Sequence, residues 1–164
     1  MPARLETKSP AETPRLSLSI QSDSPGTTCP VSRSRLRRWV ALALQGNARL
    51  TLRFVGSREA RRLNSSYRGK DYATNVLTFN YQAPSAQMAS PGCDADIVIC
   101  LPVVRREARE QGKPFDHHLA HLVIHGVLHA QGYDHLRQAQ AKAMEALETA
   151  LLRRLRIPDP YAFN

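Results

Sequence analysis

Two histidines four residues apart are the part of this sequence best suited to hold a metal ion. His125 and His129 lie in an apolar stretch, and residues at this spacing project from one face of an α-helix. A pair alone is more often a feature of a helix surface than a metal site. Here Gly132 follows, and glycine readily adopts the left-handed conformation that ends a helix. The chain can then turn and bring His135 to the pair, so the spacing predicts one Zn²⁺ ion bound by His125, His129 and His135.

Three protein ligands would leave the fourth position of a tetrahedral Zn²⁺ ion to water, which is typical of catalytic zinc sites. The pattern matches that of the metzincin zinc hydrolases, H-E-x-x-H-x-x-G-x-x-H, except that Gly126 replaces the glutamate. Bound Zn²⁺ lowers the pKa of water to about 7, so hydroxide forms near neutral pH. In metzincin peptidases the glutamate accepts the proton of that water. Because glycine cannot do so, the sequence disfavours peptide hydrolysis.

Other histidines precede the predicted ligands on the same helix. His117 and His121 continue the four-residue spacing, and His118 stands beside the first of them. One ion cannot use so long a row, because the rise along the helix accumulates. We expect His121 to be packed or to support a ligand. We expect His117 and His118 to be exposed on the first turn, after Asp116 as the N-cap.

Two longer blocks of the sequence resemble the YbeY family of bacterial endoribonucleases, which act in ribosomal RNA maturation. Residues 121–135 read HLVIHGVLHAQGYDH, and residues 63–79 read LNSSYRGKDYATNVLTF. A shorter match, DIVI, occupies residues 96–99. The resemblance covers about residues 48–161, and its small departures, at residues 80, 95 and 130–131, affect no predicted ligand.

The resemblance implies a single-strand-specific, zinc-dependent endoribonuclease, a hydrolase that matures the 3′ end of 16S ribosomal RNA. It also implies a role in ribosome biogenesis and quality control. The partners would be a ribosomal RNA precursor, small-subunit ribosomal proteins and a ribosome-associated GTPase, and the location would be the cytoplasm. Two alternatives stay open: a non-catalytic ribosome-assembly factor with a structural metal, and a divergent metallopeptidase.

Phosphodiester cleavage also calls for a cation that faces the non-bridging oxygens. Arg68 matches the family's arginine position, and a guanidinium has the fixed fork that suits a phosphate, so Arg68 is the predicted catalytic cation. Alternatively, Arg68 pairs with Asp71 or another carboxylate and braces a turn. Lys70 is a second possible phosphate contact. Asp134 either orients a ligand histidine or caps the last helix.

Composition is consistent with a nucleic-acid partner. The chain has 164 residues, a formal net charge of +9 and a pI of about 10.1, and an excess of basic residues favours polyanions. The same arginines would also suit solvated helix faces. Three cysteines without paired spacing indicate reduced thiols in a cytosolic protein. We expect no membrane association and no secretion signal, because no apolar run approaches the roughly 18–20 residues that span a bilayer.

Hydrophobic periodicity predicts a single α+β domain over residues 14–161, after a disordered tail at 1–13. Strands are expected at 16–20, 50–54, 76–81 and 96–100, and helices at 32–44, 57–67, 102–111, 117–131 and 136–156. Ser57 is the expected cap of the second helix. The two early β-α-β steps favour parallel pairs, and the last two strands favour an antiparallel pair. The expected architecture is a small four-stranded mixed sheet with about five helices and a metal site on a helix of the C-terminal half.

Overall fold

The computed structural model describes residues 13–22, 26–29, 31–81, 92–134 and 136–162. Four strands form one mixed sheet in the order β1-β2-β4-β3: β1 (Leu16–Ser22), β2 (Asn47–Val55), β3 (Val76–Asn80) and β4 (Gly92–Cys100). Five helices accompany it in these residues: α1 (Arg33–Ala43), α2 (Ser57–Arg68), α3 (Leu101–Glu110), α4 (Phe115–Ala130) and α5 (Gln138–Arg154). The predicted single α+β domain is confirmed. The tail predicted at residues 1–13 lies almost wholly outside the described residues.

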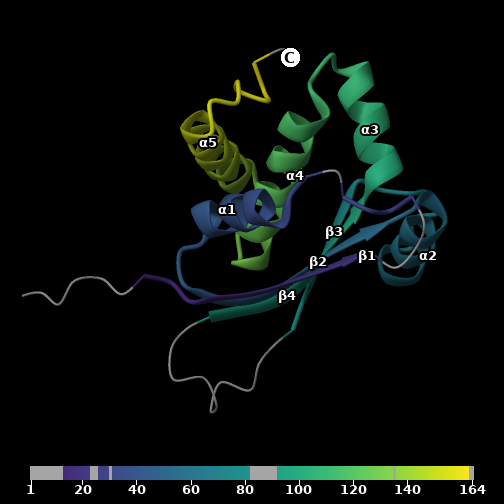
Figure 1. Cartoon of the computed structure of the whole chain (residues 1–164), viewed down its shortest axis with the longest axis horizontal. Helices are drawn as coiled ribbons and strands as arrows, with labels where there is room; N and C mark the ends of the chain where they lie inside the picture. The colour runs from purple at the N-terminus through teal and green to yellow at the C-terminus, as the bar shows by residue number, and fades with distance from the viewer. Residues whose placement is uncertain (1–12, 23–25, 30, 82–91, 135, 163–164) are drawn as a thin grey trace, which may run out of the picture.

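The two faces of the sheet are covered by different helices, because successive side chains of a strand point to opposite faces. Leu50, Leu52 and Phe54 of β2 and Ile97 and Ile99 of β4 belong to the larger core. Figure 1 shows α1, α4 and α5 on that side of the sheet. The opposite face carries a smaller core that joins β2, β3 and β4 to α2, and α3 contributes side chains to both cores.

The predicted pairing of the second and third strands is wrong. β2 pairs in parallel with β4, in the register Asn47↔Gly92 to Val55↔Cys100, and β3 pairs antiparallel with β4 from Val76↔Ile99. β4 therefore lies between β2 and β3. Its last six residues are mostly buried and apolar on both faces, which suits a central position, while β3 takes the sheet edge.

Two helix starts also differ from the prediction. Gly56, rather than Ser57, is the N-cap of α2, and Pro114 is the N-cap of α4. Asp116 lies inside the first turn of α4, where its Oδ2 accepts a hydrogen bond of 3.1 Å from Arg35 of α1. A carboxylate in the first turn still favours the helix N-terminus electrostatically.

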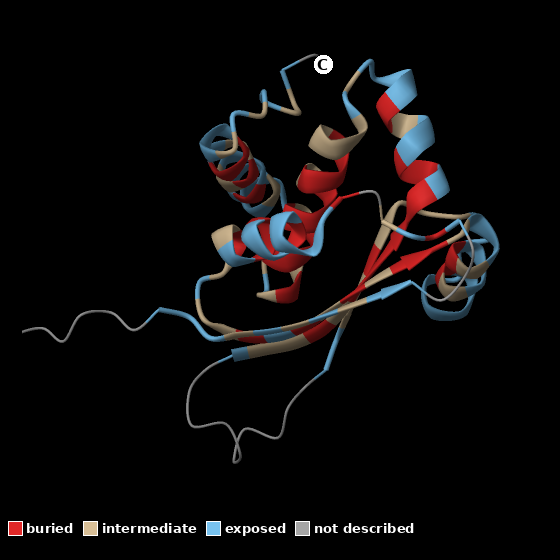
Figure 2. Ribbon diagram, in the orientation of Figure 1, coloured by how far each residue is buried: buried red, intermediate tan, exposed pale blue. Residues whose placement is uncertain are grey.

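Helix α4 runs through the centre of the molecule and is mostly buried (Figure 2), except for the half-buried face that carries His121, His125 and His129. Gly126 lets it approach the sheet closely. A Cβ added at Gly126 would lie 2.8 Å from Cγ2 of Ile97 and 3.6 Å from Cγ2 of Val76. The position where metzincins have glutamate thus faces packed sheet side chains, and a side chain there would require the Ile97 side chain to shift.

Candidate metal centre

The structure places two of the three predicted ligands together on α4. The imidazole rings of His125 and His129 are stacked, with centroids 6.4 Å apart and planes 6° apart. Two parallel rings one helical turn apart present equivalent nitrogens in the same direction. The arrangement suits two ligands to one ion.

Both rings are held through Nδ1. Nδ1 of His125 lies 2.7 Å from Oε1 of Glu148, and Nδ1 of His129 donates to the backbone carbonyl of Tyr133 at 2.9 Å. Metal-ligating histidines commonly bond a carboxylate or a carbonyl through the nitrogen that does not bind the metal. The donor set therefore fits Zn²⁺ through Nε2 of each ring.

The third predicted ligand, His135, lies outside the described residues. Gly132 has a φ of +99°, as expected of the residue that lets the chain turn after α4. Within the described ranges, no three His, Cys, Asp or Glu side chains form a group suited to a metal ion. The three-histidine set therefore stays a prediction.

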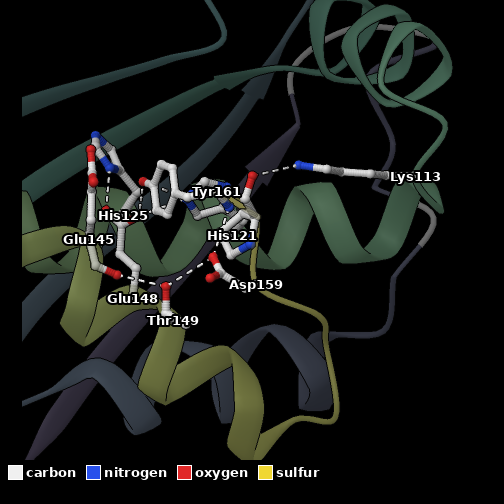
Figure 3. A network of polar contacts seen from close by, with 9 residues as sticks. Lys113, His121, His125, Glu145, Glu148, Thr149, Asp159 and Tyr161 are labelled. Carbon is white, nitrogen blue, oxygen red and sulfur yellow. Dashed lines mark hydrogen bonds and ion pairs between the residues drawn. The ribbon is translucent and has the colours of Figure 1, made fainter. Parts of the chain in front are cut away.

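Glu148 of α5 is the functional candidate that the sequence reasoning missed. Its side chain is fully buried, and its carboxylate accepts hydrogen bonds from His121, His125 and the Tyr161 hydroxyl (Figure 3). Burial alone would raise the pKa of Glu148, but these partners lower it to about 2. Burial and the adjacent carboxylate raise the pKa of Tyr161. Glu148 is therefore a buried anion that holds His125.

A signal for Glu148 was present in the sequence. It follows Met144 by four residues and precedes Leu151 by three, so it lies on the buried face of α5. A carboxylate on an apolar helix face is costly unless it is paired, and the nearby histidines are its partners. The hydrogen bond from His121 Nε2, at 2.7 Å, places His121 beside the same carboxylate.

His118 and Asp134 lie near the predicted ligands, at the start of α4 and just after its end. The expectation that His118 is exposed is wrong, because only 5% of it is accessible. Oδ1 of Asp134 accepts from the backbone amide of Leu136 at 3.3 Å. The contacts that orient His125 and His129 come from Glu148 and the Tyr133 carbonyl, and a role of Asp134 toward the third predicted ligand stays a prediction.

Arg68 lines a different part of the surface. It is the exposed last residue of α2 and lines a hollow of about 610 Å³ with Tyr67, Phe79 and Tyr81, which we call the aromatic groove. Tyr67 and Phe79 meet edge to face at 4.8 Å. None of the described histidines lines this groove. The role of Arg68 at the scissile phosphate stays a prediction.

The alternative that Arg68 pairs with Asp71 is wrong. Asp71 instead accepts two hydrogen bonds from Arg61, at 2.8 and 3.0 Å. This fork is fully exposed, and it lowers the pKa of Asp71. The turn after α2 is thus braced by Arg61, and its αL residue is Gly69, with a φ of +67°.

These features define a class of protein: a single α+β domain with a mixed sheet and a buried helix that presents paired histidines to a candidate hydrolytic centre. The family model described as endoribonuclease YbeY matches residues 27–156. The chain belongs to the YbeY family of endoribonucleases, as its sequence resemblance predicted.

Relatives of high identity support this assignment. The chain is 52% identical to an endoribonuclease YbeY of Thiobacillus denitrificans over 148 residues, which cover 90% of this chain and 97% of that protein. It is 51% identical to one of Bordetella pertussis, covering 89% of this chain and 96% of the relative.

A solved structure shares the fold. The solution structure of TM1509 from Thermotoga maritima matches with a TM-score of 0.50 and 24% identity, and it covers 85% of this chain and 91% of that one. None of the helices in the described ranges is long and apolar enough to cross a lipid bilayer.

Proposed function

We propose that this protein is a zinc-dependent endoribonuclease that cuts single-stranded RNA, with a ribosomal RNA precursor as its substrate. One observation carries the proposal: the stacked pair His125 and His129, each held through Nδ1 by an acceptor suited to a metal ligand. The names of the relatives supply the substrate class, RNA. Action at the 3′ end of 16S ribosomal RNA rests on the family resemblance alone.

The chain's own residues have distinct roles in this proposal. His125, His129 and His135 hold the ion. When bound, Zn²⁺ supplies a Lewis acid and lowers the pKa of a coordinated water. Glu148 fixes the ring of His125 and balances the charge of the site. Because Arg68 lines the aromatic groove and none of the described histidines does, this proposal assigns it to a phosphate of the same RNA strand, in place of the catalytic role expected from the sequence.

The packing around Gly126 favours a nuclease over a peptidase. The glutamate that serves metzincin peptidases would not fit here unless Ile97 shifted, because its Cβ would lie only 2.8 Å from Cγ2 of Ile97. The net charge of +9 favours a polyanionic substrate. Small-subunit ribosomal proteins, a ribosome-associated GTPase and a cytoplasmic location belong to the proposal through the family resemblance.

The decisive test compares three proteins purified identically without a histidine tag: wild type, His129→Ala and His117→Ala. His117 is a matched control because it lies on the same helix, three turns from His129, and outside the predicted ligand set. We expect about one zinc per chain and RNA cleavage in wild type and His117→Ala, and loss of both in His129→Ala.

The same preparations distinguish the alternatives. Equal cleavage by all three proteins would identify a contaminating ribonuclease. Bound metal and RNA binding without cleavage would favour a ribosome-assembly factor with a structural metal. Turnover of general peptide substrates would favour a metallopeptidase. RNA affinity should fall steeply as the salt concentration rises.

A further inference from the structure

A second hollow adjoins the histidine pair. It has a volume of about 600 Å³, within the range of small-ligand pockets, and lies between α3, α4 and the C-terminal segment. We call it the polar hollow, and the residues used below are Asn75, Glu107, Lys113, His118, His125 and Tyr161. Because His125 lines it, the polar hollow opens beside the candidate metal centre.

His118 is the feature of the polar hollow that points to a ligand. The residue is 5% exposed, and neither ring nitrogen has a hydrogen-bond partner in the described part of the chain. Its Nε2 lies 3.7 Å from Oε2 of Glu107, which is beyond hydrogen-bond distance. Buried polar atoms are almost always paired, because an unpaired one has lost its hydrogen bonds to water without a replacement. A ligand with complementary groups would satisfy this ring.

Glu107 stands beside His118 as a fixed acceptor. The Asn75 amide donates to both carboxylate oxygens, at 2.9 and 3.2 Å, and the Asn75 Oδ1 accepts from the backbone amide of Val76 at 2.7 Å. Burial favours the neutral acid, but the nearby His118 ring and the Asn75 amide outweigh it and lower the pKa of Glu107. The carboxylate is thus ionised at neutral pH, and its two oxygens have lone pairs for further donors.

The other residues of the polar hollow suit a planar ring that is attached to a phosphate: Tyr161 supplies an aromatic ring, and Lys113 supplies a positive charge. Tyr161, held by its hydroxyl against Glu148, contributes an aromatic ring, and its ring meets that of His121 edge to face at 5.5 Å. Figure 3 shows Tyr161 close to His121 and His125, with Lys113 directed toward the same C-terminal segment. Lys113 Nζ donates to the Pro160 carbonyl at 3.3 Å. This contact is with a neutral group, so the positive charge of Lys113 stays beside the polar hollow.

These observations match one nucleobase better than the others. The Watson–Crick edge of guanine presents two adjacent donors, N1–H and N2–H, beside the acceptor O6. A carboxylate accepts both donors in parallel, and an imidazole N–H beside it donates to O6. Uracil and cytosine do not present this order, and adenine has no O6. Single-stranded RNA is generally read in this way, with unstacked bases bound on their Watson–Crick edges and against aromatic rings.

We propose that the polar hollow binds an unstacked guanine of the RNA substrate, through Glu107 and His118, next to the phosphodiester that is cut. The inference rests on the proposed endoribonuclease function. His118 precedes His125 by seven residues on α4, about 10 Å along the helix axis, so the bound base lies a short, fixed distance from the candidate metal centre. The hollow would then set the position of cleavage.

The first experiment uses the wild-type holoprotein and short oligouridylates that carry one guanosine, one inosine or none. We expect cleavage at a constant distance from the guanosine, wherever it is placed. Each such base contact discriminates by about 5- to 150-fold, so the guanosine substrate should be cut that much faster than plain oligouridylate. Inosine lacks the 2-amino group and should give an intermediate rate. Equal rates and scattered cut sites for all three RNAs would overturn the proposal.

The second experiment compares Glu107→Gln with Glu110→Gln, on the same helix. Glu110 is exposed and pairs with Arg106 at 3.9 Å, outside the polar hollow. Glu107→Gln should lose the guanosine preference while it still binds zinc and cuts oligouridylate, and Glu110→Gln should keep the preference. Retention of the preference in Glu107→Gln would overturn the proposal.

Two controls keep the two proposals separate. If Glu107→Gln unfolds, the binding of guanosine and inosine oligonucleotides to metal-free wild type, followed by fluorescence anisotropy, gives the answer: a preference for guanosine supports the hollow, and none overturns it. Failure of every RNA to be cut by zinc-loaded protein would contradict the proposed function. Cleavage without base preference would contradict only the guanine site.

Discussion

The polar hollow and the aromatic groove share no lining residue and differ in chemistry. The polar hollow has an ionised carboxylate, the buried His118 ring and an amide, which suit hydrogen bonding. The aromatic groove has exposed tyrosine rings and the Arg68 guanidinium, which suit stacking and phosphate contact. The edge strand β3 connects them, because Asn75 and Val76 line the hollow while residues 77–81 line the groove. One sequence block therefore supplies two surfaces.

The largest expected effect concerns Glu148, which holds His125 beside the polar hollow. Glu148→Ala should destabilise the protein by about 3–5 kcal/mol, because it leaves buried groups without their anionic partner. Zinc affinity should also fall by about 10- to 100-fold. Chemical denaturation and zinc titration measure the two effects, and Glu145→Ala, an exposed site on the same helix, is the control. Unchanged zinc affinity would remove Glu148 from the metal centre.

The next effect concerns the groove side. Because Arg68 and the described histidines line different hollows, Arg68→Ala should weaken RNA binding and raise KM by about 10- to 100-fold, as expected for loss of a charged hydrogen bond. The slope of log affinity against log salt concentration should become shallower by about one, because one phosphate contact is lost. Stability should change by less than about 0.5 kcal/mol at this exposed position. A drop of about 10²–10³ in kcat at constant KM would instead place Arg68 at the scissile phosphate and break the comparison.

A smaller effect tests how closely α4 packs against the sheet at Gly126. Gly126→Ala adds a methyl group against Ile97, at a cost of about 1–3 kcal/mol, and gains about 1 kcal/mol of helix propensity. We expect a net loss of up to about 2 kcal/mol by thermal or chemical denaturation. In an Ile97→Ala background the same change should be neutral or stabilising. An equal loss in both backgrounds would show that Ile97 is not the obstacle.

The smallest expected effect is a pH dependence within the polar hollow. The pKa of Glu107 is lower in the folded protein than its usual value, so the ionised carboxylate stabilises the fold above the unfolded-state pKa. This stabilisation is lost as the pH falls through the folded-state pKa. The difference in unfolding free energy between wild type and Glu107→Gln should therefore shrink below about pH 4.5. A difference that stays constant with pH would show that Glu107 gains nothing from His118 and Asn75.

Hydrophobic periodicity predicted the helices and strands of this fold well, but it did not predict which strands pair with one another. Alternation in β2 and the apolar run of β4 identify strands, yet neither shows that β4 lies between β2 and β3. That order depends on which strand has the most apolar surface to bury on both faces, a property of the whole sheet. The spacing of His125 and His129 was enough to place both on one face, because a helix fixes that relation locally.

Buried polar residues were the main failure at the site. His118 and Glu148 were missed, because sequence reasoning treats charged and imidazole side chains as exposed by default. Their burial depends on partners from other elements, with α3 supplying Glu107 and α5 supplying the acceptor for His125. Such tertiary pairing is invisible to a local pattern, although the position of Glu148 on an apolar face was a usable signal.

The close burial of α4 also has a consequence for amide hydrogen exchange. Backbone amides exchange slowly where they open only when the whole domain unfolds, and helices wrapped by core elements belong to this group. Leu119, Ala120, Val123, Ile124, Val127 and Leu128 of α4 are completely inaccessible. The amides around His125 should then report global unfolding, whereas those of the exposed last turn of α2 exchange through local fraying. The candidate chemistry is thus carried by the part of the backbone that opens last.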